Sequence, residues 1–368
     1  MEPIKPHYVW AFVSVALLAC CIVAGIFIFG STGEKQPFTV GIVMSGAKDD
    51  DGWNLQHYVG LLEACSENGV RLLVEEHVAE NTADAADASR RLVENGAQVI
   101  VLSGYSFLGG AYEYIWSHPE IAFYAKSTEY TLPNVTAFYG RIYQARYLAG
   151  MLAGAYTRSG SIGYVAAMPV AEVNRGIAAF ALGVQRVNPA ARVHVAWTNA
   201  WRDDEKEKQN TQTLVSQCGA DIIAYQQDND NVAKAAQQAG VACIGYNLKS
   251  PAVRQYCLAE ITFDWKKIYL ALLKHAAQTG RNKADSLWPG MECGVVDMKC
   301  SEKLVPESVR ARIHEAREKM RRGEQLVFTG EIYDSTGKLR CRDNEYISDR
   351  HLFRYFDWHP ANVDFVNP

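Results

Sequence analysis

The chain has 368 residues, of which 48% are apolar, so it is long enough for two compact domains with substantial cores. Its formal net charge of −4 and its isoelectric point near 6.2 provide no basic field that would attract a polyanion. We therefore expect no nucleic-acid partner.

The first 36 residues form a segment of their own. Residues 8–30 carry no charged side chain, and as a helix they would reach about 34 Å, enough to cross a bilayer. Three interpretations are open: a cleaved signal peptide, a lipoprotein signal acylated at Cys20, or an uncleaved anchor. We favour the anchor, because the apolar run is longer than a signal peptide needs and stays apolar after Cys20. Lys5 before the span indicates an inside amino terminus and an exported remainder.

Seven further cysteines follow this segment, and none of them forms a CxxC pair. A zinc site is therefore not expected, nor any other metal or cofactor. In an oxidising compartment some of these thiols could pair, with Cys293, Cys300 and Cys341 the nearest in character, but spacing cannot give the connectivity.

After a polar linker at 31–37, strands and helices alternate along the chain. Strands are predicted at 38–44, 70–76, 99–102 and 121–125, with helices after residue 55 and at 83–95. A spacing of about 25 to 30 residues per βα unit indicates a parallel, doubly wound sheet.

The alternation then restarts with a long helix at 142–156, whose small residues Gly150 and Gly154 favour close packing. Further strands are predicted at 161–167, 193–197, 221–225, 242–246 and 261–263, and helices at 175–187, 204–216, 233–239, 266–278 and 306–322. Two consecutive α/β blocks suggest two similar lobes with a cleft between them.

Candidate site residues stand at the carboxyl ends of the predicted strands, where ligands of such sheets bind. The set combines aromatic, carboxylate and amide side chains: Asp51, Trp53, Asn54, Tyr105, Phe107, Trp197, Asn199, Trp201, Gln227, Asp228, Asn247 and Asp264. It contains no cationic cluster for a phosphate, so it suits a neutral ligand with a flat ring and several hydroxyl or amine groups.

Two members of this set have a structural role as an alternative to ligand binding. Asp51 could cap the helix that follows it, and Trp197 could belong to the core. Trp53 is the strongest candidate, because a loop tryptophan beside three acids has little to pack against. It could stack on a flat ring.

Signatures of enzymes are missing from the sequence, which contains no Gly-x-Ser-x-Gly elbow, Walker loop, GxGxxG or His-Glu-x-x-His. We therefore expect a binding protein without catalytic residues.

Several short motifs, in order and at matching spacing, resemble the basic-membrane-protein family of solute-binding proteins, the purine-nucleoside receptors of certain ABC importers. They are Asp51-Gly52-Trp53-Asn54, Arg146-Tyr147-Leu148-Ala149-Gly150, Val173-Asn174-Arg175-Gly176, Trp197-Thr198-Asn199-Ala200-Trp201 and Phe328-Thr329-Gly330-Glu331-Ile332-Tyr333-Asp334.

The resemblance implies a type I periplasmic-binding-protein fold, in which two doubly wound parallel-sheet lobes close about a hinge. It implies an N-lobe of 37–138 and 258–292, and a C-lobe of 139–257 and 293–368 with a C-terminal extension, after the segment 1–36. Trp53 would stack on one face of the base, flanked by Asp51 and Asn54. Related sequences tend to have ionisable groups where this chain has the amides of Gln226 and Asn247, which bears on which purine binds.

The hypothesis is an extracytoplasmic protein, held at a bacterial membrane through residues 8–30, that captures a purine nucleoside or nucleobase for an ABC permease. One alternative is a tethered ligand sensor with the same fold. A less favoured one is a nucleoside hydrolase with Asp51 or Asp228 as its base.

Overall fold

The computed structural model describes residues 38–50, 52–80, 82–126, 132–279 and 285–367, and residues 39–368 form one compact unit. The predicted membrane segment at 8–30, Cys20 and Asp51 lie outside the described residues. Within the described ranges, no helix combines the length and apolarity that crossing a membrane requires.

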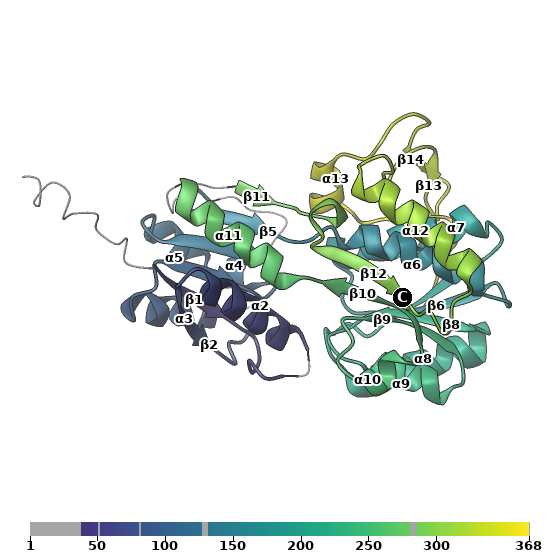
Figure 1. The fold of residues 1–368 in the computed structure, drawn as a ribbon, viewed down its shortest axis with the longest axis horizontal. Coiled ribbons are helices and arrows are strands. Elements are labelled where there is room, and N and C mark those ends of the chain that lie inside the picture. Colours follow the sequence, from purple (N-terminus) through teal and green to yellow (C-terminus); the bar gives the residue numbers. More distant parts are fainter. Residues whose placement is uncertain (1–37, 51, 81, 127–131, 280–284, 368) are drawn as a thin grey trace, which may run out of the picture. The chain divides into compact units, whose positions relative to one another are not determined.

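The first lobe is built on a six-stranded parallel sheet in the order β11-β5-β4-β3-β1-β2 (Figure 1). Its strands are β1 (Thr39–Val43), β2 (Arg71–Glu75), β3 (Val99–Leu102), β4 (Ala122–Lys126), β5 (Val135–Phe138) and β11 (Asp285–Leu287). Its helices are α2 (Trp53–Glu67), α3 (Asp84–Glu94), α4 (Phe107–Gly110), α5 (Tyr112–Ser117) and α11 (Trp265–Thr279).

Alternating side chains of these strands face two helical layers, as the twofold period of a strand requires. In β4, Phe123 packs into the cluster that includes residues of α3, α4 and α5. The next residue, Tyr124, points the other way, and its hydroxyl is 3.0 Å from Nδ1 of His275 in α11. The first lobe is therefore doubly wound, as predicted.

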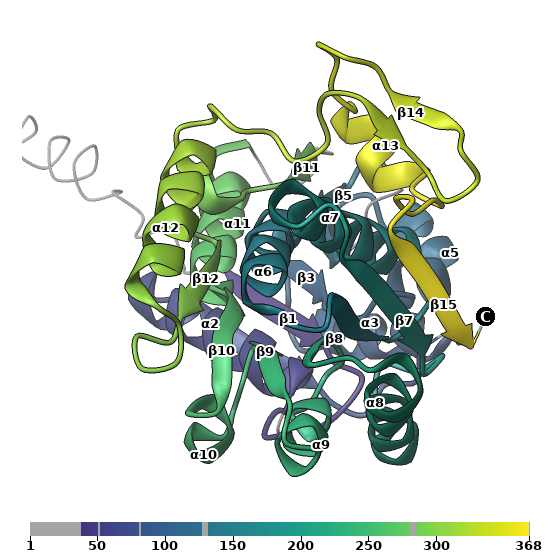
Figure 2. The same ribbon diagram turned by 90° about the vertical axis from the view of Figure 1, so that its right-hand side faces the viewer.

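The second lobe is built on a seven-stranded sheet in the order β12-β10-β9-β8-β6-β7-β15, and Figure 2 shows β15 beside β7. Its strands are β6 (Ser161–Ala166), β7 (Arg192–Trp197), β8 (Ile222–Gln226), β9 (Ala242–Tyr246), β10 (Cys257–Phe263), β12 (Val296–Cys300) and β15 (Val363–Asn367). Its helices are α6 (Ile142–Tyr156), α7 (Ala171–Val187), α8 (Asp204–Cys218), α9 (Asn231–Gln238), α10 (Pro251–Arg254) and α12 (Glu307–Arg321).

This second sheet is mixed and not all-parallel, because β12 runs antiparallel to β10. Neighbouring residues of β6 again face different helices: Gly163 lies against Leu214 of α8, whereas the Tyr164 ring is 5.4 Å from the Phe180 ring of α7. This lobe too has helices on both faces.

The close packing expected of the small residues in α6 is confirmed. A Cβ atom at Gly150 would lie 1.9 Å from the Phe180 carbonyl oxygen of α7, and one at Gly183 would lie 2.1 Å from the Tyr147 carbonyl oxygen. The backbones of α6 and α7 therefore touch, which only glycine permits at these two positions.

The chain passes between the lobes three times: from β5 to α6, from β10 to α11, and from β11 to β12. Sheet membership differs from the expected lobe division at one element. We expected the N-lobe to resume at residue 258, but β10 pairs with β9 and β12 of the second sheet. The return to the first lobe comes with α11, after Phe263, because residues 257–263 complete a strand before they cross.

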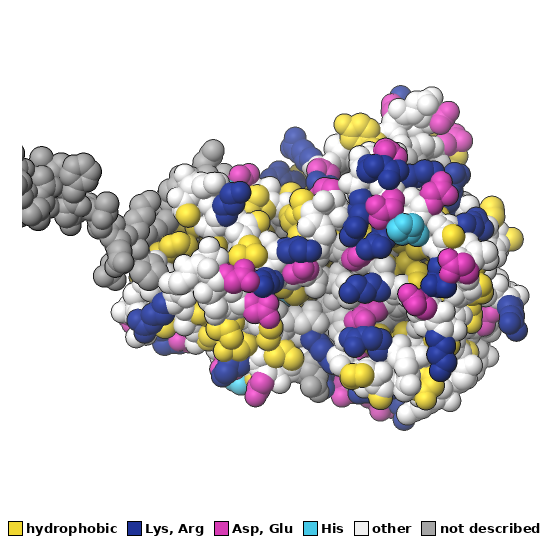
Figure 3. Space-filling model, in the orientation of Figure 1, with side chains coloured by type: hydrophobic (Ala, Val, Ile, Leu, Met, Phe, Trp, Pro, Cys, Tyr) yellow, Lys and Arg dark blue, Asp and Glu magenta, His cyan; other side chains and the backbone are white. Residues whose placement is uncertain are grey.

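The remaining elements lie at the C-terminal end: the 3₁₀ turn η1 (Met291–Cys293), the hairpin of β13 (Ile332–Tyr333) and β14 (Leu339–Cys341), and α13 (Asp349–Arg354). The dense charge of α12 forms a solvated face, and Figure 3 shows basic and acidic side chains interspersed there. Acidic and basic side chains pair on this face, as Lys319 and Glu315 do at 2.6 Å. Cys293, Cys300 and Cys341 are free thiols in this structure.

Candidate functional site

A cavity of about 270 Å³ lies between the lobes, at the carboxyl ends of both sheets. The first lobe contributes Ser45, Trp53, Glu80, Tyr105 and Lys126 to its lining. The second lobe contributes Glu172, Trp201, Gln226, Asp228 and Tyr246. The expectation that strand ends from two lobes converge on one site therefore describes its position correctly.

Trp53 lines the cavity from the first turn of α2. Its indole Nε1–H donates to the Ser103 carbonyl at 3.0 Å, which fixes the ring plane. His57 and Trp265 pack behind it, with ring centroids 4.2 and 5.2 Å away. The reason given from the sequence, that this side chain has nothing to pack against, was therefore wrong, although the ring does face the cavity.

Behind Trp53, His57 is fully buried and hydrogen-bonds through Nδ1 to the Tyr269 hydroxyl. Burial lowers the pKa of His57 well below its ordinary value, with Lys126 and Lys249 adding to the effect. The imidazole is therefore a neutral packing group that supports the aromatic wall.

Two aromatic side chains complete the wall from opposite lobes. The Tyr105 and Trp201 rings lie with centroids 6.1 Å apart and an interplanar angle of 50°. Tyr105 is held by Glu80, whose Oε1 accepts from the Tyr105 backbone N–H at 3.1 Å and whose Oε2 accepts from the Ser106 hydroxyl at 3.0 Å. Both oxygens of Glu80 thus already orient the loop that carries Tyr105.

An ion pair joins the two lobes inside the cavity. Lys126 Nζ, at the end of β4, lies 2.7 Å from Glu172 Oε2, in the first turn of α7, and the two side chains are only 4% and 5% exposed. The other oxygen of Glu172 accepts from the Tyr139 hydroxyl and, at 3.4 Å, from Gln226 Nε2. A buried pair of this kind needs further hydrogen bonds to offset its desolvation, and on the Glu172 side both oxygens accept one.

Sequence reasoning missed this pair. Lys126 closes an apolar strand and resembles an ordinary surface charge, and Glu172 resembles an acid that complements a helix dipole. The one available signal was the position of Lys126 directly at a strand's carboxyl end.

Asp228 is a carboxylate of the lining that is available to a ligand. It is half-buried in the lining, and among the described residues its carboxylate has no hydrogen-bond partner. Burial raises the pKa of Asp228 to about 7, with the negative charge of Glu172 adding and the positive charge of Lys126 opposing. A carboxylate placed in this way can accept from a ligand N–H or O–H group.

Asn54, which we expected to bind ligand, instead shapes the loop before α2. Its Nδ2 donates to Asp50 Oδ2 at 2.9 Å, and Asp50 Oδ1 accepts from the backbone N–H groups of Gly52 and Leu55, also at 2.9 Å. Asp50 therefore caps the start of α2, because its carboxylate reaches forward over the turn; Asp51, for which the sequence suggested this role, lies outside the described residues.

Three other expected site residues point away from the cavity. Phe107 is fully buried in the core beneath the first sheet. Trp197 stacks on Phe365 of β15 at 6.1 Å and 11°, so the core interpretation describes it. Asn199 is exposed in a left-handed turn with φ of 57°. Trp197 is the last residue of β7 and Phe107 the first of α4, so both side chains pack with their own elements.

Gln227 acts one layer behind the cavity. Its side-chain amide contacts Thr198 Oγ1 at 2.8 Å, and in the orientation that satisfies every partner its nitrogen donates to the Trp201 carbonyl at 2.9 Å. The Asp228 backbone N–H donates to the same carbonyl at 3.0 Å. Gln227 is therefore a positioning residue for Trp201.

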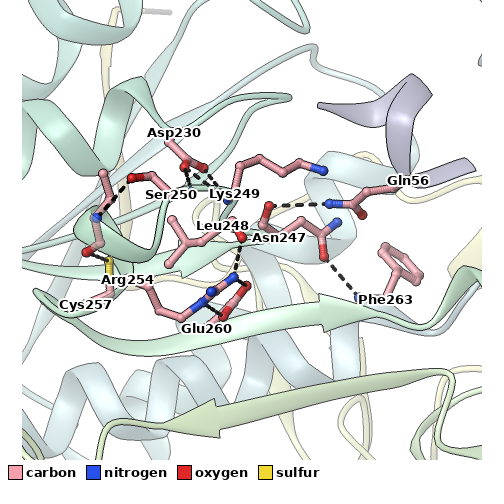
Figure 4. Close-up of polar contacts among 11 residues, drawn as sticks. Gln56, Asp230, Asn247, Leu248, Lys249, Ser250, Arg254, Cys257, Glu260 and Phe263 are labelled. Atoms are coloured by element: carbon pink, nitrogen blue, oxygen red, sulfur yellow. Dashed lines mark hydrogen bonds and ion pairs between the residues drawn. The ribbon is translucent and has the colours of Figure 1, made fainter. Parts of the chain in front are cut away.

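Asn247 and Asp264 hold the crossing segments instead of the ligand cavity. Asn247 Oδ1 accepts from the Phe263 backbone N–H at 3.1 Å (Figure 4). Asp264 Oδ1 accepts from the Lys267 backbone N–H at 3.2 Å at the start of α11. Both lie beside a separate, more open groove next to the crossing.

The lobes also touch beside this crossing. Gln56 of α2 donates to the Asn247 carbonyl at 3.4 Å (Figure 4), and Lys249 Nζ donates to the Gly52 carbonyl at 3.1 Å. A Cβ atom at Gly52 would lie 2.2 Å from the Asp228 carbonyl oxygen. At Gly52 the first lobe therefore packs tightly against the loop that carries Asp228.

Two doubly wound lobes, three crossing segments and a cavity between them define a periplasmic-binding-protein fold. The model of the PnrA-like ABC transporter substrate-binding proteins matches residues 38–327, and the chain belongs to this family. Its partners are accordingly a small-molecule ligand and an ABC permease, and its place of action is extracytoplasmic.

Among curated relatives, a purine-binding protein of Brucella abortus is 30% identical over 93% of this chain and 97% of its own length. A protein of Haloferax volcanii, named for glucose binding by an ABC transporter, is 30% identical over 83% of this chain and 78% of its own. Among solved structures, a solute-binding protein from Conexibacter woesei matches with a TM-score of 0.62 at 20% identity, over 78% of this chain and 98% of that one.

Proposed function

We propose that the interlobe cavity binds an unphosphorylated purine nucleoside or nucleobase for delivery to an ABC permease. The observation that carries the proposal is that aromatic rings from both lobes, Trp53 and Trp201, line the cavity together with an Asp228 carboxylate available to accept from a ligand. A flat heterocycle that bears N–H groups stacks on the aromatic rings and donates to the carboxylate.

The volume of the cavity and the charges of its lining further restrict the class of ligand. A volume of about 270 Å³ is at the small end for ligand sites, which range from about 300 to 1,000 Å³. Among the described residues, the lining carries the carboxylates of Glu80, Glu172 and Asp228 against one ammonium, that of Lys126, which Glu172 already pairs. A phosphate would meet repulsion from these carboxylates, so a nucleotide fits poorly.

The Brucella relative's purine binding supports the assignment, and the Haloferax relative's name gives a specific second candidate, a sugar. Carboxylates accept well from adjacent sugar hydroxyls, and an aromatic wall also packs on a sugar face. The two candidates differ in what the aromatic rings contribute, because only a purine offers a π-face to stack.

Calorimetry on the full chain in mild detergent tests the proposal with inosine, guanosine, adenosine, their free bases, uridine, guanosine monophosphate and glucose. We expect a purine to bind most tightly and the monophosphate to bind at least tenfold more weakly than its nucleoside. Tight glucose binding with no purine binding would establish the sugar alternative.

For the amino terminus, we propose that residues 8–30 stay attached as a membrane anchor, because the uncharged run is long enough to span a bilayer. Intact-mass measurement of membrane-extracted protein tests this. The full-length mass supports an anchor, whereas a mass beginning at an acylated Cys20 would show a lipoprotein.

The alternative function for the same site is that of a membrane-tethered ligand sensor with the same fold. Uptake of labelled purine by cells with and without the chain distinguishes the two: a transporter component is needed for uptake, and a sensor is not.

A further inference from the structure

The Lys126 ammonium sits inside an aromatic cage. Its Nζ lies 5.0 Å from the ring centres of Tyr105 and Tyr139, 5.2 Å from that of Trp53 and 5.4 Å from that of Trp201. Cations are attracted to aromatic faces within about 6 Å, and cages of several rings are how proteins recognise ammonium ligands. Here the rings come from both lobes and surround a side chain of the protein itself.

The charges around this cage also favour a cation. Glu172 lies 2.7 Å from Lys126 Nζ, and Glu80 and Asp228 line the same cavity. Among the described residues, every charged group of the lining other than Lys126 is a carboxylate, and carboxylates beside aromatic rings are what binds an amine or a quaternary ammonium ion.

We propose that Lys126 determines whether the ligand can be charged. Its ammonium occupies the cation position of the cage, so the site rejects cationic ligands. The site takes instead an uncharged ligand that presents a hydrogen-bond acceptor to Lys126. Where the proposal takes the ligand to be a purine, it rests on the proposed function. An ammonium has three N–H donors, and among the described residues Lys126 Nζ has one acceptor, Glu172 Oε2. A purine carbonyl or ring nitrogen would supply another.

A pair of nearly identical nucleosides tests the purine part. Guanosine is neutral, whereas 7-methylguanosine carries a positive charge in its ring system. Wild-type protein is expected to bind guanosine at least tenfold more tightly, and K126M, which keeps the length of the side chain but removes its charge, is expected to shift the affinity ratio at least tenfold toward 7-methylguanosine. An unchanged ratio in K126M, or equal binding of both by wild type, would overturn the proposal.

A second experiment needs no purine. K126A removes three carbons and the ammonium, the segment that propylammonium replaces, so propylammonium should raise the melting temperature of K126A by several degrees more than that of wild type, and propan-1-ol of the same length should not. The matched control is K48A, since Lys48 pairs with Glu76 at 2.9 Å on the surface, with side chains 45% and 27% exposed. No cation-specific stabilisation of K126A, or an equal effect in K48A, would contradict the cage assignment.

If K126A does not fold, K126Q keeps an amide donor toward Glu172 and serves in the nucleoside comparison, with the same expected shift and the same refuting result. Failure of every purine to bind would refute the proposed function alone, because the propylammonium measurement would still decide the role of Lys126.

Discussion

Substituting Gly52 by alanine should weaken ligand binding without unfolding either lobe. The added Cβ would lie 2.2 Å from the Asp228 carbonyl oxygen, where atoms closer than 3.0 Å essentially never occur. To relieve the contact, the lobes must separate by roughly 1 Å at this point. That movement also stretches the 3.1 Å bond from Lys249 Nζ to the Gly52 carbonyl.

Overpacking of this size typically costs about 1 to 3 kcal/mol. The cost falls on the state in which the lobes touch, because Gly52 and Asp228 belong to different lobes. Since about 1.4 kcal/mol is a factor of ten in affinity, the dissociation constant should rise by about 5- to 150-fold.

Calorimetry with the tightest purine, together with the melting temperature of the ligand-free protein, measures both effects. G109A is the matched control, because a Cβ at Gly109 would meet nothing within 4 Å. It should leave affinity and melting temperature unchanged. Wild-type affinity in a folded G52A protein would refute the idea that this contact is made in the ligand-bound state.

Three further outcomes follow from the site and the core. W53A should lose about 5- to 150-fold in purine affinity by calorimetry, the cost of about 1 to 3 kcal/mol of base stacking, whereas W116A, at a tryptophan that is 61% exposed, should lose nothing. Because the pKa of Asp228 is raised to about 7, a ligand that donates to its ionised form should bind about tenfold more weakly for each pH unit below 7 and equally well above about pH 8. D228N should bind weakly at every pH, and a wild-type profile in D228N would refute the role of this carboxylate. G150A, whose Cβ would lie 1.9 Å from the Phe180 carbonyl oxygen, should lower the melting temperature by several degrees, and a wild-type melting curve would contradict the tight packing of α6 on α7.

The sequence alone predicted the elements whose pattern is local. Apolar runs located β1, β3 and β4, and the helical period located α3, α6 and α8 to within a few residues. These elements obey local rules, because strand and helix periodicity act over a handful of residues. The glycines of α6 likewise showed in advance that another backbone would pack closely against it.

Sheet membership required the tertiary structure. Strand β15 joins β7 from more than 160 residues further along the chain, and β10 stays in the second sheet although its sequence suggested a return to the first lobe. Nothing local distinguishes these outcomes, because a strand's partners are chosen by long-range packing.

The cavity's residues likewise divide into those that the sequence predicted and those that required the tertiary structure. Strand ends gave the cavity's position, and with it Trp53, Tyr105, Trp201 and Asp228, because the carboxyl ends of parallel strands meet at one edge. They could not give the direction of each side chain, so Phe107 proved to be core.

Lys126 and Glu172 each resemble an ordinary surface charge along the chain. Only the approach of the two lobes removes them from water, places them 2.7 Å apart and surrounds the ammonium with rings. The sequence by itself therefore determined the kind of fold and the edge at which the interlobe cavity lies. The tertiary structure decided which charges line the cavity, because burial and pairing are properties of residues that meet from distant parts of the chain.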